Sequence, residues 1–402
     1  MFHPTKNLKT AEFVSLLAMM ISILALSIDA VLPAFDLIAR DFKLANPNDA
    51  QLVLSAMFLG FAVGQLAVGP LSDCYGRKPV IYIGYVIFIV GCLVSLMAED
   101  YNLHLSGRVL QGLGAAAPRI VGVALVRDGY EGREMARIMS IVMAIFILVP
   151  VVAPGVGQAV MLFADWRMIY VLFLAMALIA FIWFAVRQPE TLTKPARHKF
   201  SVLGILTSIR EAVGYRVLTG YTIALGIIFG AFLGYLNSAQ AVFRTTFGAG
   251  DLFAVYFGFA ALSIGAASVV NSALVVRLGM RYLTWRALVG ITLLACVMAI
   301  GAIVYAGPIP LWLFMVWLLA SFFCIGILFG NFYSMAMEPV GHMAGVGAAV
   351  VGSVSTFISL PLGWAIGVQF DGSIIPLTSG FAVSGILTLA VMWWTELGQG
   401  ST

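Results

Sequence analysis

Twelve long apolar runs constrain the fold of this chain more than any other feature of its sequence. A helix needs about 20 mainly apolar residues to cross the hydrocarbon core of a bilayer. The runs cover roughly residues 13–36, 51–72, 80–97, 103–126, 137–160, 166–186, 217–240, 252–276, 283–305, 309–336, 343–369 and 376–395. We therefore predict an all-α membrane protein with twelve transmembrane helices.

The composition excludes a soluble domain. Of the 402 residues, 62% are hydrophobic and only 10% are charged, whereas soluble domains carry about 25% charged residues. The first run is too long for a cleaved signal peptide and lacks a small-residue cleavage site. The four cysteines are scattered and show no metal or disulfide spacing. No phosphate-binding G-x-x-x-x-G-K-S/T loop is present. We expect no metal, no cofactor, no ATP coupling and no enzymatic activity.

Basic residues set the orientation. With the N-terminus inside, most of the 22 basic residues fall in cytoplasmic segments, and the outer segments hold only Arg40, Lys43, Arg167 and Arg244. This bias follows the positive-inside rule, so we expect both termini in the cytoplasm of a cell whose inner or plasma membrane holds the protein. The net charge of +4 then reflects membrane orientation and not nucleic-acid binding.

The longest polar interval, 188–215, separates six runs from six. We predict a six-helix bundle over 1–187, a cytoplasmic linker over 188–215 and a second six-helix bundle over 216–402. Two such halves are how many transporters are built, with the substrate site between them near mid-membrane. The loop after the eighth run reads Arg277-Leu-Gly279-Met-Arg281 and is similar to Asp73-Cys-Tyr-Gly76-Arg77. Because the two loops hold equivalent places in the two halves, the similarity supports an internal repeat.

The segment Gly69-Pro-Leu-Ser-Asp73-Cys-Tyr-Gly76-Arg77-Lys78-Pro79 is predicted to be a tight loop between the second and third runs. Its prolines limit helix continuation, and Gly76 permits a backbone that other residues would strain. Asp73 and Arg77 stand four residues apart, which allows their side chains to meet on a helix. The alternative is a charged turn that only orients the protein.

Two charged residues lie inside apolar runs. A carboxylate such as Asp29 costs about 2.5–3.5 kcal/mol within a bilayer, so it should face a cavity or a partner. Arg108 and Asp29 are both expected about 10 Å deep, so they could meet. The alternatives are a permanent pairing of Asp29 with a base, and an Arg108 side chain that reaches the outer headgroups. Gly112 and its small neighbours would let helices approach closely.

The fifth run carries Pro150, Pro154, Gly155 and Gly157 within eight residues. This composition predicts a kinked helix against which a neighbour packs tightly. A simple helix defect is the alternative.

These motifs resemble those of the major facilitator superfamily. The Gly69–Pro79 segment is similar to the superfamily's signature loop between helices 2 and 3, although Cys74 replaces the usual base. Arg108-x-x-Gln111-Gly112 resembles the span-4 motif to which proton transfer has been ascribed. The run Pro150–Gly157 resembles the proline–glycine motif of the antiporters. The pair Asp29-x-x-x-Pro33 is similar to the span-1 signature of drug:proton antiporters.

Further segments resemble the Bcr/CflA branch, which confers bicyclomycin and chloramphenicol resistance. They are Val126–Tyr130, Asp165–Arg167 and Ala336–Gly345. The resemblance implies a rocker-switch exporter with helices 1, 4, 7 and 10 around a central cavity. It also implies a cytoplasmic latch in which Asp73 and Arg77 hold Arg127 and Asp128.

Candidate cavity residues lie on the seventh and tenth runs, where aromatic rings with a few amides would form a mostly apolar pocket. Those with polar tips are Tyr235, Asn237, Asn331 and Tyr333. Each could instead face lipid or a neighbouring helix.

The sequence thus predicts a proton-coupled antiporter that exports small amphiphilic drugs by alternating access, with Asp29 and Arg108 coupling protons to transport. The partners expected are protons, a small-molecule substrate and lipid, with no nucleic acid, and the protein is expected to be a monomer. The nearest alternative exports an endogenous metabolite such as an amino acid, siderophore or polyol. A passive facilitator or a membrane sensor is a further alternative. Glu338 and Asp36 are secondary candidates for the coupling role.

Overall fold

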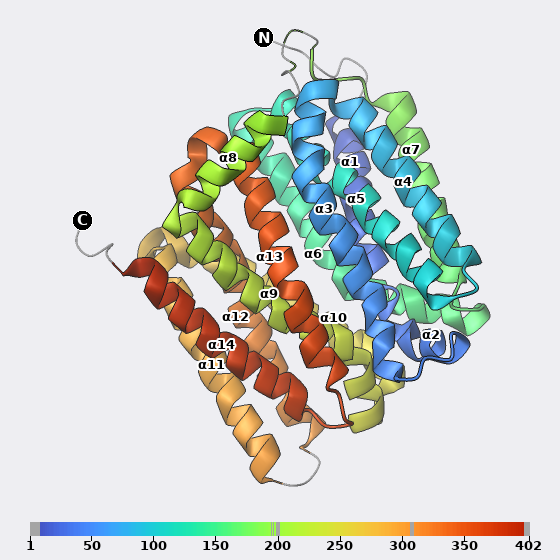
Figure 1. Ribbon diagram of the computed structural model, residues 1–402, viewed down its shortest axis with the longest axis vertical. Helices are drawn as coiled ribbons and strands as arrows, with labels where there is room; N and C mark the ends of the chain where they lie inside the picture. The colour runs from blue at the N-terminus through green and yellow to red at the C-terminus, as the bar shows by residue number, and fades with distance from the viewer. Residues whose placement is uncertain (1–8, 194, 196, 198–201, 306–308, 398–402) are drawn as a thin grey trace. The chain divides into compact units, whose positions relative to one another are not determined.

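The computed structural model describes residues 9–193, 195, 197, 202–305 and 309–397, and all of its regular secondary structure is helical. Twelve of the described helices contain 20 residues or more. They follow one another along the chain (Figure 1), and the two longest connections are 30–51 between the first and second of them and 188–215 between the sixth and seventh. The predicted all-α fold with twelve long helices agrees with this architecture.

The chain forms two compact units, each of which holds six of the long helices. Unit 1 comprises Met1–Lys43 and Leu52–Leu206, and unit 2 comprises Leu44–Gln51 and Thr207–Thr402. The short segment Leu44–Gln51 belongs to unit 2, where the Asn48 Nδ2 donates hydrogen bonds of 3.1 Å and 2.9 Å to the carbonyls of Val368 and Phe370. Residues 194, 196 and 198–201 of the predicted linker lie outside the described residues.

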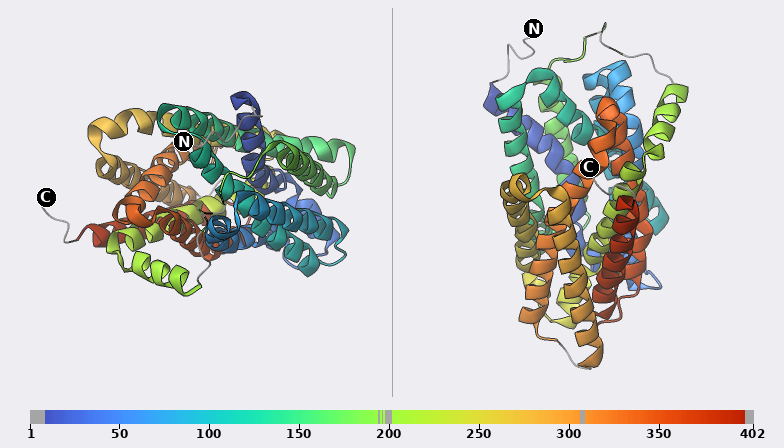
Figure 2. Two further views of the ribbon diagram at one scale, coloured as in Figure 1. Left: turned by 90° about the horizontal axis from the view of Figure 1, so that it is seen from above. Right: turned by 90° about the vertical axis from the view of Figure 1, so that its left-hand side faces the viewer.

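Unit 1 is built around α5, which packs along both α3 and α4, while α1 packs against α6. Its helices, seen from three directions in Figures 1 and 2, are α1 Thr10–Asp29, α2 Phe35–Asp41, α3 Leu52–Tyr75, α4 Arg77–Met97, α5 Tyr101–Gly129, α6 Gly132–Phe163 and α7 Met168–Arg187. The 3-10 helix η1 Leu32–Ala34 lies between α1 and α2. Close packing around α5 depends on glycine, because a Cβ on Gly112 would overlap the Met57 carbonyl of α3.

Unit 2 is built around α9, which packs along α13, α14 and α12. Its longer helices are α9 Arg216–Ala241, α10 Phe253–Leu278, α11 Met280–Val304, α12 Leu311–Met337, α13 Ala344–Val368 and α14 Ile375–Glu396, and α8 Val202–Gly214 precedes them across the boundary between the units. The short elements are η2 Pro47–Gln51, the π-helix η4 Val242–Thr246, η5 Gly250–Leu252 and η6 Glu338–Met343.

The two units share one backbone detail. Gly76 alone separates α3 from α4, with φ 107° and ψ 162°, and Gly279 alone separates α10 from α11, with φ 81° and ψ 152°. Both lie in the positive-φ region that glycine adopts without a Cβ penalty. The similarity between Asp73–Arg77 and Arg277–Arg281 therefore includes the backbone conformation as well as the matching residues.

The long helices suit a membrane. Eleven helical stretches of the described residues are long and apolar enough to cross a bilayer, and one of them, Leu311–Val368, contains both α12 and α13. Large apolar side chains such as Leu162, Phe163 and Val276 are almost fully exposed. Such exposure is unfavourable in water and expected in contact with lipid.

Candidate functional site

The α3–α4 junction is shorter than the predicted loop. Helix α3 continues through Gly69, Pro70 and Asp73 to Tyr75, so a single residue, Gly76, connects it to α4. The expectation of a loop over 69–79 was therefore wrong in length. Pro79 falls in the first turn of α4, where a missing N–H costs nothing because that turn has no helical acceptor.

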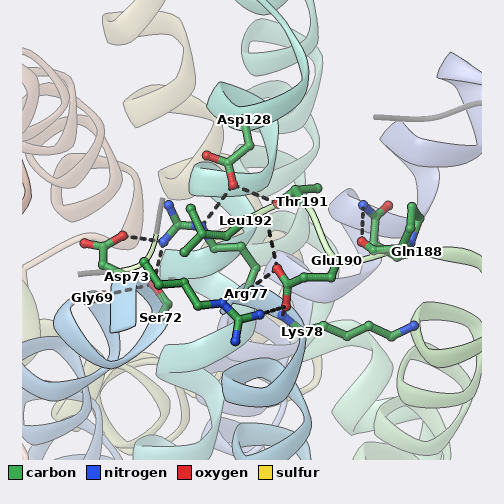
Figure 3. Close-up of polar contacts among 12 residues, drawn as sticks. Gly69, Ser72, Asp73, Arg77, Lys78, Asp128, Gln188, Glu190, Thr191 and Leu192 are labelled. Atoms are coloured by element: carbon green, nitrogen blue, oxygen red, sulfur yellow. Dashed lines mark hydrogen bonds and ion pairs between the residues drawn. The ribbon is translucent and has the colours of Figure 1, made fainter. Parts of the chain in front are cut away.

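Arg77 is the centre of this junction. Its side chain is only 7% exposed. Its Nε donates to Asp128 Oδ2 at 3.0 Å, and its Nη1 donates to Asp73 Oδ1 at 2.5 Å and to Ser72 Oγ at 2.9 Å. Figure 3 shows these contacts. The structure brings three of the four predicted latch side chains together, while Arg127 is exposed and has no ion pair with any described residue.

Glu190 completes the junction, and sequence reasoning missed it. Its carboxylate accepts hydrogen bonds from the backbone N–H groups of Arg77 at 2.9 Å and Lys78 at 3.0 Å (Figure 3). These are among the first N–H groups of α4, which have no acceptor within their own helix, and a negative charge is favoured at this end of the helix dipole. We call Asp73, Arg77, Asp128 and Glu190 the junction cluster.

A second polar connection runs from Glu190 to α5. The Thr191 hydroxyl donates to Asp128 Oδ2 at 2.7 Å, and the Leu192 N–H donates to Glu190 Oε1 at 3.0 Å. The segment that follows α7 thus contacts the start of α4 and the end of α5. The signal in the sequence was an acid just beyond the end of an apolar run, but nothing in its spacing identified the helix that it would contact.

Arg108 does not pair with Asp29. The guanidinium is fully buried and donates to Ser27 O at 2.8 Å, to Val53 O at 3.2 Å and to Gln111 Oε1 at 2.6 Å. Helix α1 ends at Asp29, so the Ser27 carbonyl is one of the last four, which lack a helical N–H partner. The expected Arg108–Asp29 pairing is therefore corrected: Arg108 satisfies the end of the α1 backbone two residues before Asp29.

Asp29 is buried at a break in the first span. The chain passes from α1 through η1, where Pro33 holds an early position, into α2. The Asp29 side chain is 5% exposed, and it makes no hydrogen bond or ion pair with any other described residue. A buried carboxylate without such a partner is costly in its charged form.

The buried network around Arg108 extends to His104, which the sequence had not singled out. Gln111 Nε2 donates to Ser95 Oγ at 3.0 Å and to Gly91 O at 3.1 Å. The ring of His104 lies 3.1 Å from Ser95 O through Nδ1 and 3.0 Å from the Tyr170 hydroxyl through Nε2. Because a carbonyl only accepts, Nδ1 must carry the proton, and Nε2 then accepts from Tyr170. These side chains are all buried within unit 1.

The segment Pro150–Gly157, which was predicted to kink its helix, lies within α6. The helix continues unbroken through Pro150 and Pro154 and on past Gly155. Gly157 lies against the backbone of Ala30, where a Cβ would overlap the carbonyl oxygen. The close approach expected for these small residues is thus found directly beside Asp29.

The cavity candidates of unit 2 occupy different surroundings. Tyr235 is fully buried, with its ring 4.8 Å from that of Phe322. Asn331 exchanges two amide hydrogen bonds, of 3.0 Å and 3.1 Å, with Asn271 of α10. Tyr333 is 41% exposed. The remaining candidate is Asn237, which is 8% exposed and whose Oδ1 has no hydrogen-bond partner among the described residues.

Metal binding finds no support in this arrangement. Among the side chains that the structure describes, no group of three or more His, Cys, Asp or Glu could hold a metal ion.

The chain matches a model of the Major Facilitator Superfamily over residues 16–368. It is 28% identical over 355 residues to a bicyclomycin resistance protein homolog of Haemophilus influenzae, covering 84% of each chain. It is 27% identical over 371 residues to the multidrug resistance protein MdtL of Salmonella heidelberg, covering 90% of each chain.

Among solved structures, the xylose transporter XylE of E. coli, in a partially occluded inward-open conformation, superposes with a TM-score of 0.75 at 12% identity. The superposition covers 98% of this chain and 99% of that one, and it shows likeness of fold. The matched family and these relatives are transporters and not enzymes, and they confirm the fold class and the resemblance inferred from the sequence motifs. The family match spans most of the chain, which therefore belongs to the Major Facilitator Superfamily.

Proposed function

We propose that this transporter exports small amphiphilic compounds in exchange for protons, by alternating access. The observation that carries the proposal is the Asp29 carboxyl, buried at 5% exposure at the end of α1 without a hydrogen-bonding partner among the described residues. Ionisable groups within a membrane are costly, and they commonly mark proton relays and substrate pathways.

The surroundings of Asp29 suit a group that gains and loses a proton. A carboxylate is stable when water reaches it and costly when it is buried alone. A conformational change that alternately wets and buries Asp29 would therefore change its proton occupancy. Arg108 holds the end of α1 through Ser27 O, and Gly157 contacts the backbone of Ala30. A movement of α1 relative to α5 or α6 would therefore change the surroundings of Asp29.

The junction cluster would act as a latch on the cytoplasmic side. Its ion pairs and the Glu190 cap join α3, α4 and α5 to the segment after α7. The excess of basic residues in alternate connections supports a cytoplasmic location for this end and for both termini. We infer an inner or plasma membrane location in a bacterium and a functional monomer.

Asp29→Asn tests the proposal, because it keeps the shape of the side chain and removes its proton exchange. We expect the purified variant, in proteoliposomes with an imposed pH gradient, to lose uphill transport of a dye or phenicol while it retains downhill exchange. The matched control is Asp251→Asn, on an exposed acid of η5, which should keep uphill transport. Undiminished uphill transport by Asp29→Asn would move the coupling role elsewhere, with Glu338 tested next.

Two other functions predict different results in this assay. A passive facilitator or a sensor would show no pH-driven uphill transport even in the wild type. An exporter of an endogenous amino acid, siderophore or polyol would show the same dependence on Asp29 with a different compound. A screen of phenicols, bicyclomycin, cationic dyes and amino acids separates that alternative from drug export.

A further inference from the structure

Three neighbouring helices of unit 2 carry all of their charges at one end. Helix α14 packs against both α9 and α11 (Figure 1). The charged residues of these helices lie in the first two turns of α9 and α11 and in the last turn of α14, and they are Arg216, Arg281, Arg286 and Glu396. The remainder of each helix carries no charged side chain. The bases outnumber the acid at this end, which we infer from the distribution of basic residues to be cytoplasmic.

The acid of this group holds the three helix ends together. Glu396 Oε1 accepts a hydrogen bond of 3.0 Å from the Tyr221 hydroxyl of α9. Its Oε2 accepts one of 2.8 Å from Trp285 Nε1 of α11. Both carboxylate oxygens are therefore bonded within unit 2, and the starts of α9 and α11 are fixed beside the end of α14.

Two of the bases are exposed and stack on aromatic rings that are exposed as well. The guanidinium carbon of Arg216 lies 4.9 Å from the centroid of the Trp394 ring, and its Nη2 donates to the Trp394 carbonyl. The guanidinium carbon of Arg286 lies 5.1 Å from the centroid of the Tyr282 ring. Apart from that one hydrogen bond, neither guanidinium makes a hydrogen bond or an ion pair with any described residue. Stacking covers a face of the guanidinium, so the other N–H donors at its edge remain exposed.

Arg286 belongs to a row of exposed side chains that runs the length of α11. The row continues at helical spacing through apolar residues that are all exposed, namely Val289, Leu293, Val297, Ile300 and Val304. From Arg286 to Val304 it measures about 27 Å along the axis, close to the thickness of a hydrocarbon core. A similar exposed row on α14 consists of Val383, Leu387, Ala390 and Trp394. We expect both rows to face lipid, which places the two stacked arginines at the depth of the lipid headgroups.

We propose that this edge of unit 2 binds anionic phospholipid, with headgroup phosphates on Arg216 and Arg286 and acyl chains along the two rows. A guanidinium matches two phosphate oxygens with parallel hydrogen bonds. Tryptophan and tyrosine favour the boundary between headgroups and hydrocarbon, and the apolar rows begin directly beside the arginines, so a lipid suits this edge better than a free phosphate ion. Anionic lipids of the cytoplasmic leaflet attract bases at this depth. The proposal does not depend on the proposed antiport.

Lipid retention by the purified full-length protein tests this assignment separately from transport. Delipidated protein is mixed with phosphatidylglycerol and phosphatidylcholine of the same acyl chains, and the lipids that remain bound are counted by native mass spectrometry. Each base close to an anionic lipid is worth about fivefold in affinity, so we expect the wild type to prefer phosphatidylglycerol by about tenfold or more. Glycerol 3-phosphate, which carries the phosphate without the chains, should not displace the lipid at the same concentration.

Variants of the two arginines locate the site. Arg216→Gln and Arg286→Gln should each lower the preference about fivefold, and the double variant should bring it below about twofold. Arg286→Lys should keep part of it, because the charge remains while the planar fork is lost. Arg277→Gln is the control for loss of charge, since Arg277 is exposed at the end of α10 without a stacked ring among the described residues, and it should keep the full preference. Melting curves establish that each variant is folded, and if Arg216→Gln is not, Arg286→Gln decides alone.

The outcomes are distinct. A wild type that retains both lipids equally overturns the assignment, as does a folded double variant that keeps the preference. An equal loss in Arg277→Gln and Arg286→Gln also overturns it, because a general charge effect would then explain the data. Displacement of the lipid by glycerol 3-phosphate would overturn it in favour of a site for soluble phosphates. A preference for phosphatidylglycerol that depends on Arg216 and Arg286, in a protein without pH-driven export, would refute the proposed antiport alone and leave the lipid site standing.

Discussion

Removal of the Glu190 carboxylate is the sharpest perturbation of the junction cluster. In Glu190→Ala, three backbone N–H groups lose their acceptor, those of Arg77, Lys78 and Leu192, at 2.9, 3.0 and 3.0 Å in the structure. Two of these groups belong to the first turn of α4, where no carbonyl of the helix can replace the lost oxygen. The ion pairs of Arg77 with Asp73 and Asp128 remain in place.

The loss in the free energy of unfolding in Glu190→Ala can be estimated from known helix caps. Loss of a side-chain cap at a helix N-terminus costs about 0.5–2 kcal/mol. The Glu190 side chain is 25% exposed, so water replaces part of what is lost, and we expect about 1 kcal/mol. A difference of that size changes an equilibrium about fivefold, which is enough to shift the population between closed and open forms of the junction.

Cys74 provides the assay, since it lies within the junction and is partly exposed. In a variant whose other cysteines, Cys92, Cys296 and Cys324, are replaced by alanine, we expect maleimide labelling of Cys74 to be several-fold faster after Glu190→Ala. Glu131→Ala, at an exposed acid before α6, is the matched control. Equal labelling rates and equal melting temperatures for the two variants would refute the capping role of Glu190.

Three further predictions can be checked by thermal melting. Asp128→Asn should cost about 1–2 kcal/mol, and more than Asp73→Asn, because Asp128 is 20% exposed and Asp73 47%; a larger loss in Asp73→Asn would contradict this order. Gly157→Ala should cost about 1–3 kcal/mol through overpacking, while Gly69→Ala, with open space around it, should be neutral; equal effects would show that the contact yields freely. Tyr170→Phe should cost about 1–3 kcal/mol by leaving a buried ring nitrogen without a donor, and unchanged melting would argue against the assigned tautomer.

The helices could be predicted because each apolar run fulfils a local requirement. A span must satisfy its own backbone hydrogen bonds and present about 20 apolar residues. Both conditions depend only on residues that are consecutive in the sequence. The contact between Asp73 and Arg77 was predicted from their spacing of four residues, and it forms although Gly76 interrupts the helix between them. Gly76 was correctly identified as the position that needs an unusual backbone.

The partners of Arg108 and Glu190 could not be predicted, because they depend on where helix ends fall. The end of α1 at Asp29 exposes the Ser27 carbonyl, and Arg108 binds this oxygen instead of the carboxylate. Depth along two helices gave the level of each residue but not the direction of either side chain. Glu190 lies 113 residues from Arg77. The sequence of a helix start does not show which distant acid will accept its free N–H groups.

The role of α5 connects the two ends of unit 1. Arg108 near its start binds the end of α1, and Asp128 at its end binds Arg77, a separation of about 30 Å along the axis. Between them, Gly112 lies against the α3 backbone and Gly114 against that of α4, in contacts that leave no room for a Cβ. We expect such packing to make α3, α4 and α5 move as one body, so that a displacement at Asp29 would reach the junction without a chain of switching contacts. If so, Asp29→Asn should change the labelling rate of Cys74, and this response should disappear in a folded Gly112→Ala background; a response that persists there would show that the coupling takes another route.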